Sequence, residues 1–118
     1  IVLILCAVKV NRRQRLIYGK FDMANYVIYY DLHHRRKYDN LYKLLAAWRA
    51  VKLTESQWLV SLVVDAKQAR DFVARTLDND DTVTVLELPR GADWATVNAP
   101  AAANAWLANN VTPSQKAA

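Results

Sequence analysis

Ionisable side chains gather where a β-branched and aromatic segment, residues 26–30, ends at Asp31. The Asp31 carboxylate could hold Mg²⁺, because this ion prefers oxygen ligands and commonly keeps several waters. Such an ion could activate water and stabilise charge on a phosphodiester. If the chain forms a two-fold dimer, the symmetry could bring two copies of Asp31 face to face. The alternative is a loop aspartate that caps a turn.

Two histidines and a basic run follow Asp31 directly. His33 and His34 are adjacent, so their side chains point in different directions and a shared metal site is not expected. Either one could act as a general acid or base near a phosphate, since imidazole titrates near neutral pH. Arg35-Arg36-Lys37 could bind nucleic-acid phosphates through charge and bidentate hydrogen bonds. In the alternative interpretation these side chains are simply solvated.

Three other motifs carry weaker signals. Tyr26, Tyr29 and Tyr30 could stack on unpaired bases, but the glycine-rich signature of RNA-recognition modules is absent, which favours core packing. The acidic run at residues 78–81 lacks the glycine and glutamate of a calcium loop, so it predicts a turn. Cys6 is the only cysteine and cannot form an intramolecular disulfide, which favours a reducing, cytoplasmic location.

Alternating elements position these residues. Apolar side chains at Leu41, Leu44, Leu45 and Trp48 follow helical spacing. Asp39 or Tyr38 is expected at the start of this helix, with Asp39 as an N-cap whose carboxylate accepts hydrogen bonds from the first free amides. Asp65 followed by Gln68 predicts a capping box at the start of a second helix. Strands are expected at 26–32, 51–53, 57–64 and 82–88, and helices at 39–48, 65–77 and 101–109.

This order predicts an α+β fold, a ferredoxin-like βαββαβ sandwich whose antiparallel sheet carries two helices on one face. We expect residues 23–90 to form this domain. Residues 91–118 form a C-terminal tail with a short helix. The tail carries Trp94 and Trp106, which would be costly to leave in water, so we expect them to pack on the sheet or at an interface with a partner subunit.

The chain of 118 residues has a formal net charge of +5, which invites a nucleic-acid interpretation. Residues 1–22 hold five basic residues and one acidic residue, whereas the remainder holds 11 basic and 10 acidic residues. Met23 is the only methionine, and we expect residues 1–22 to be an extension outside the natural domain. Global charge therefore gives the domain little attraction for a polyanion.

The apolar run at residues 1–8 is too short to span a bilayer as a helix, so we expect no membrane association. Positive charges follow this run, whereas a secretory signal has them before it. The same order would fit the end of a membrane helix if the chain were a fragment.

The strand at residues 26–32, the basic loop at 35–37, the leucine-rich helix, the Ser56-Gln57-Trp58-Leu59-Val60 strand and the Asp81-Thr82-Val83 strand together resemble the CRISPR-associated protein 2 superfamily. The Ser-x-Trp-Leu strand, the Asp80-Asp81 pair and a tail with Trp94, Asn98 and Trp106-Leu107 are most similar to its SinR-like branch. The resemblance implies a ferredoxin-like homodimer that either cleaves nucleic acid with a metal or bridges it. Asp31 matches the metal-associated aspartate of that family. Trp58-Leu59 departs from the aromatic–glutamate pair of nuclease members, which weakens the nuclease expectation more than the fold.

Two hypotheses follow from the sequence. The first is a small homodimer that binds nucleic acid or cleaves it as a Mg²⁺-dependent endonuclease, with Asp31 as the metal-associated and catalytic residue. The second is a non-catalytic module that docks a protein partner in a toxin–antitoxin or mobile-element system.

Overall fold

The computed structural model describes residues 16–17, 20–21, 23–34 and 38–112. In chain order the elements are β1 (Leu16–Ile17), β2 (Lys20–Phe21), β3 (Ala24–Asp31), α2 (Asp39–Ala47), β4 (Val51–Thr54), β5 (Gln57–Leu62), α3 (Ala66–Ala74), β6 (Thr82–Glu87) and α4 (Ala101–Asn110). β1 and β2 pair with each other in a separate two-stranded sheet.

The remaining strands form one antiparallel sheet in the order β4-β5-β3-β6. β3 lies at the centre, where Ile28 pairs with Trp58 of β5 on one side and with Val85 of β6 on the other. Its β-branched and aromatic residues suit a pleated, half-buried surface. Within the described residues β6 pairs only with β3, so it forms an edge. The chain is thus α+β, and its arrangement is compatible with the predicted ferredoxin-like fold.

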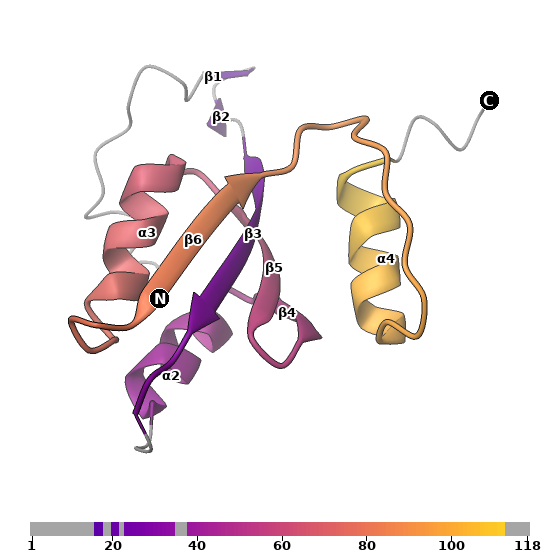
Figure 1. Cartoon of the computed structure of the whole chain (residues 1–118). Coiled ribbons are helices and arrows are strands. Elements are labelled where there is room, and N and C mark those ends of the chain that lie inside the picture. Colours follow the sequence, from indigo (N-terminus) through magenta and orange to yellow (C-terminus); the bar gives the residue numbers. More distant parts are fainter. Residues whose placement is uncertain (1–15, 18–19, 22, 35–37, 113–118) are drawn as a thin grey trace.

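α2 and α3 cover one face of the sheet (Figure 1). Alternate residues of β3 point to this face, and Ile28 is fully buried. The helical stripe predicted for α2 is confirmed, since Leu41, Leu44 and Leu45 are all buried. The buried residues of this main core are Tyr26, Ile28, Tyr30, Tyr38, Leu41, Leu44, Leu45, Trp48, Val60, Leu62, Val64, Ala69 and Val73.

α2 and α3 differ in how their ends are capped. The capping box predicted at α3 is confirmed: the Gln68 N–H donates to Asp65 Oδ1 at 2.7 Å, and the Asp65 N–H donates to Gln68 Oε1 at 3.2 Å. α2 has Tyr38 as its N-cap with no side-chain cap bond, so Asp39 is its first helical residue. Arg49, two residues beyond the end of α2, adopts the left-handed backbone conformation with φ 57°.

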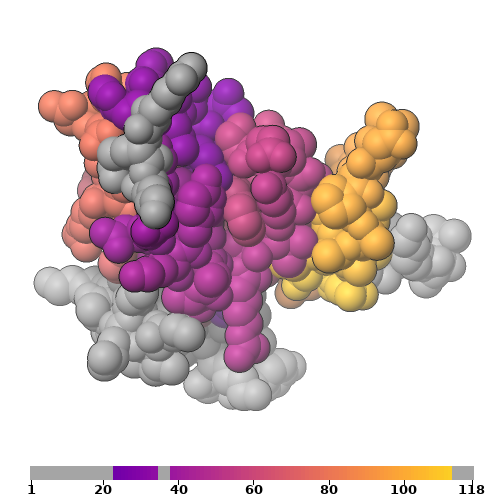
Figure 2. All heavy atoms as spheres, turned by 90° about the horizontal axis from the view of Figure 1, so that it is seen from below, coloured from indigo at the N-terminus to yellow at the C-terminus, as the bar shows by residue number. Residues whose placement is uncertain are grey.

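α4 covers only part of the other sheet face. Leu107 and Ala103 of this helix pack against Leu59 of β5, together with Val111 just beyond the helix. In Figure 2, α4 stands at one side of the molecule, beside the magenta surface of the β4–β5 region. Asn25 ties the helix to the sheet, because its amide donates to the Asn110 carbonyl at 3.0 Å.

The rest of that face carries exposed side chains. Leu86 is 62% exposed and Tyr29 is 40% exposed, and the register places them on neighbouring strands β6 and β3. Asp31, two residues beyond Tyr29, lies on the same face. In the part of the chain that the structure describes, no helix has the length and apolar character needed to cross a bilayer.

Candidate functional site

Asp31 is the last residue of β3 and pairs with Thr82, the first residue of β6. Its side chain is 60% exposed, and Oδ2 lies 3.7 Å from His33 Nε2. That separation is too long for a hydrogen bond but places the imidazole beside the carboxylate. Asp31 therefore offers carboxylate oxygens to solvent at the end of the strand.

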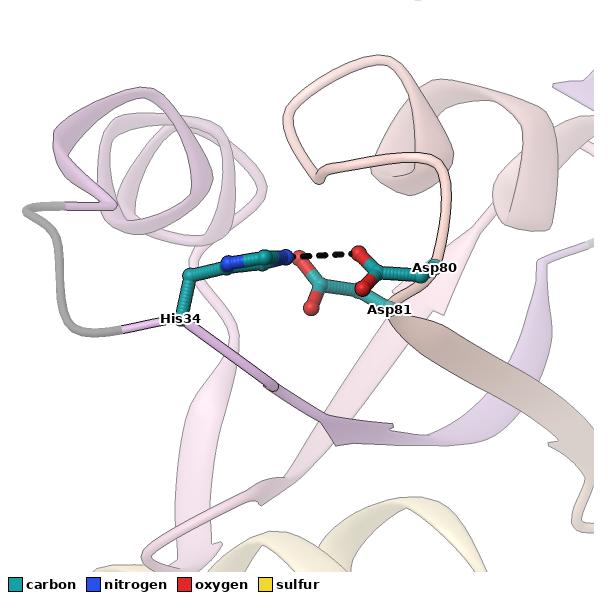
Figure 3. Close-up of side chains that lie close together, drawn as sticks. All are labelled: His34, Asp80 and Asp81. Carbon is teal, nitrogen blue, oxygen red and sulfur yellow. Dashed lines mark hydrogen bonds and ion pairs between the residues drawn. The ribbon is translucent and has the colours of Figure 1, made fainter.

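His34 contacts a different set of carboxylates. Its Nε2 lies 2.7 Å from Asp80 Oδ1 (Figure 3). The same nitrogen lies 3.9 Å from Asp78 Oδ2. The hydrogen bond to Asp80 and the negative charge of that carboxylate raise the pKa of His34. A larger share of His34 is therefore protonated at neutral pH than of a free imidazole.

Asp81 fastens the two loops together. Its Oδ1 accepts a hydrogen bond from the His33 N–H at 2.8 Å, and its Oδ2 accepts from the Asp78 N–H at 2.9 Å and the Tyr38 hydroxyl at 3.0 Å. Partial desolvation favours the neutral acid, but these hydrogen bonds outweigh it and lower the pKa of Asp81. Asp81 is thus an ionised anchor for the loop that carries both histidines.

The sequence predicts a turn and the entry to a strand at residues 78–81, and nothing in it connects these residues to His34. The two segments are 46 residues apart along the chain. What brings them together is the antiparallel pairing of β3 with β6, which places the end of one strand beside the start of the other. That pairing follows only when the order of strands in the sheet is known.

The remaining predicted site residues are the basic run at residues 35–37 and the two tryptophans of the tail. Arg35, Arg36 and Lys37 fall outside the described residues. Trp94 and Trp106 both pack at the α4 cluster within the chain, and Trp94 Nε1 donates to Thr112 Oγ1 at 3.0 Å. Both indoles remain partly accessible.

The tyrosines of β3 divide between the two faces. Tyr26 and Tyr30 are buried in the main core, whereas Tyr29 faces solvent and differs from the expectation of core packing. The Tyr30 hydroxyl accepts a hydrogen bond from Trp58 Nε1 at 2.9 Å. Burial raises the pKa of Tyr30 to about 12, so this phenol stays neutral at physiological pH. Only Tyr29 keeps a face on which a base could stack.

Two surface hollows in the described part of the chain lie away from the Asp31 end of the sheet. One surface hollow, of about 350 Å³, lies between α3 and β6, and another, of about 370 Å³, is lined by Met23, Trp48 and Trp106 among others. Neither hollow includes Asp31, His33, His34, Asp80 or Asp81 in its lining.

The chain matches no protein-family model, and no curated protein matches it significantly.

Proposed function

We propose that the chain is a ferredoxin-like homodimer, similar to the CRISPR-associated protein 2 superfamily, that binds nucleic acid and hydrolyses phosphodiesters with Mg²⁺ at Asp31. The observation that carries the proposal is the exposed Asp31 carboxylate at the end of β3, with the His33 imidazole 3.7 Å away. The order of β3, α2, β4, β5, α3 and β6 in the chain and in the sheet supports the ferredoxin-like assignment.

The surroundings of Asp31 fit a hard cation. Within the described residues its carboxylate accepts no hydrogen bond, and His33 is the one neighbour that approaches as an ion pair. One carboxylate per chain is a thin site for Mg²⁺, so Asp31 from a second copy would complete it. The bound ion would supply charge stabilisation at the phosphate and an activated water.

The exposed sheet face supplies a surface for that second copy. Tyr29 and Leu86 lie on the same face as Asp31 and expose apolar area that α4 does not cover. An isologous contact through this face would bury both side chains and place the two copies of Asp31 near the two-fold axis.

His33 is placed to serve as the acid. In hydrolysis, water forms the new P–O bond, the ester P–O bond breaks, and the leaving oxygen takes a proton. A protonated His33, whose Nε2 lies 3.7 Å from Asp31 Oδ2, can give that proton. The carboxylates of Asp78, Asp80 and Asp81 make this edge acidic, so a phosphate can approach only where cations offset them.

The test uses the full chain with labelled single- and double-stranded RNA and DNA, in Mg²⁺ and in EDTA. We expect cleavage in Mg²⁺ only, with Asp31→Asn lowering the rate by about 100-fold or more. The matched control is Glu87→Gln, which removes an exposed carboxylate at the other end of the sheet register and should leave the rate unchanged. Equal cleavage by wild type and Asp31→Asn, or a monomer by light scattering, would contradict the proposal.

A second candidate function is a non-catalytic docking module. Leu86 favours it together with Tyr29, its exposed diagonal neighbour on the same sheet face, because grouped apolar side chains on an exposed face are typical of an interaction surface. In that case nucleic acid is not cleaved and Asp31→Asn is silent, whereas Leu86→Ser weakens assembly with the partner.

A further inference from the structure

Three side chains from two loops converge beside the Asp31 end of the sheet, and Asp31 is not one of them. His34 follows β3, and Asp80 and Asp81 precede β6; Figure 3 shows the imidazole directed at the two carboxylates. One ligand atom from each residue lies within 4.8 Å of the other two, and His34 Nε2 is 2.7 Å from Asp80 Oδ1. The ring nitrogen and the carboxylate oxygens thus surround one small volume.

The donor set has a recognisable chemistry. One imidazole nitrogen with two carboxylate oxygens suits Zn²⁺ and related transition ions, whereas Mg²⁺ prefers oxygen alone. Ligands about 2.1 Å from a tetrahedral ion lie about 3.4 Å from one another. His34 Nε2 and Asp80 Oδ1, 2.7 Å apart, are closer than this value, and all three ligand atoms lie within 4.8 Å of one another, so the His34–Asp80 hydrogen bond must open to admit an ion.

Asp81 is already fixed in position by the fold. A carboxylate has about four lone-pair sites, and three are taken by the hydrogen bonds from the His33 N–H, the Asp78 N–H and the Tyr38 hydroxyl. One lone pair remains for a cation. Supporting hydrogen bonds of this kind orient metal ligands and reduce the ordering needed on binding.

We propose that His34, Asp80 and Asp81 form a Zn²⁺ site that links the loop after β3 to the turn before β6. The site is separate from the proposed Mg²⁺ site at Asp31 and does not depend on it. Three protein ligands leave a fourth position open to water or to an anionic oxygen.

The experiment titrates the full chain with Zn²⁺ in a calorimeter, in a Cys6→Ser background that removes the only thiol. We expect one ion per chain, a rise in melting temperature with Zn²⁺, and at least about a tenfold loss of affinity in His34→Ala and in Asp80→Asn. A parallel titration with Co²⁺ reports coordination directly through the visible absorption of the bound ion.

The matched controls are His33→Ala, which removes the adjacent imidazole, and Glu87→Gln, which removes an exposed carboxylate elsewhere on the sheet. Both should bind Zn²⁺ as the parent does, and so should Asp31→Asn. Absence of binding to the parent, equal binding by all variants, or loss confined to Asp31→Asn would overturn the site. Because Asp31→Asn is predicted to lose cleavage but keep Zn²⁺, failure of this proposal is distinguishable from failure of the proposed function.

Discussion

The two faces of the sheet bury different numbers of side chains. The face under α2 and α3 holds thirteen of the buried residues, whereas the cluster under α4 holds four, Leu59, Ala103, Leu107 and Val111. Because the hydrophobic contribution to stability grows with the apolar area that is buried, the face under α2 and α3 supplies most of that contribution. On the second face Tyr29 and Leu86 are exposed to solvent, and Asp31 lies there at the end of β3. The contrast teaches that one face supplies most of the buried core, while the other leaves large apolar side chains exposed.

The largest expected effect comes from the face under α2 and α3. Leu45 is fully buried, and Leu45→Ala removes packing at the centre of the main core, so we expect a loss of about 3 kcal/mol in the free energy of unfolding. Urea denaturation followed by circular dichroism measures it. Lys43→Ala on the exposed side of the same helix should change stability by less than about 0.5 kcal/mol. A loss at Leu45→Ala no larger than that of Leu107→Ala under α4 would contradict the distinction between the faces.

A smaller and more local effect is expected at α4. Leu107 is 4% exposed in a cluster of few residues, so Leu107→Ala should cost about 2 kcal/mol. Hydrogen exchange should show faster exchange in α4 and unchanged protection in β3, because a weakly packed element opens on its own. Asn109→Ala, on the exposed side, serves as control. Uniform loss of protection across the sheet would show that the two faces form one cooperative unit.

The smallest effect concerns the polar link between α4 and the sheet. Asn25 is buried, donates to the Asn110 carbonyl and accepts a hydrogen bond from the Ser61 hydroxyl. Asn25→Ala leaves these partners unsatisfied and should cost about 1 kcal/mol. A double-mutant cycle with Ser61→Ala, read by thermal unfolding, should give a coupling energy above about 0.5 kcal/mol. Additive losses would mean that the hydrogen bond contributes nothing.

Features that depend on local sequence could be predicted. The stripe of leucines in α2, the capping box at Asp65 and the strand ending at Asp31 each follow from side-chain spacing or a short-range hydrogen bond. The N-cap predicted at Asp39 is wrong, because Tyr38 is the N-cap of α2 and no side chain caps it.

Features that depend on the order of strands could not be predicted. His34 meets Asp80 and Asp81 only because β6 lies beside β3, and nothing within either loop specifies the other. The exposure of Tyr29 likewise depends on how far α4 extends across the sheet. α4 is rich in alanine and has no strong apolar stripe, so its sequence does not indicate which surface it covers.

The position of β6 at the edge of the sheet has a consequence for behaviour at high concentration. Its outer side presents backbone N–H and C=O groups that no strand of the described chain pairs with, and such a row is a template for strand addition by another molecule. The strand has only six residues, it ends in the charged Glu87, and Pro89 follows close behind. A charge and a proline are both known obstacles to edge-to-edge pairing. The same short strand that positions the acidic turn is therefore protected against open-ended fibre growth.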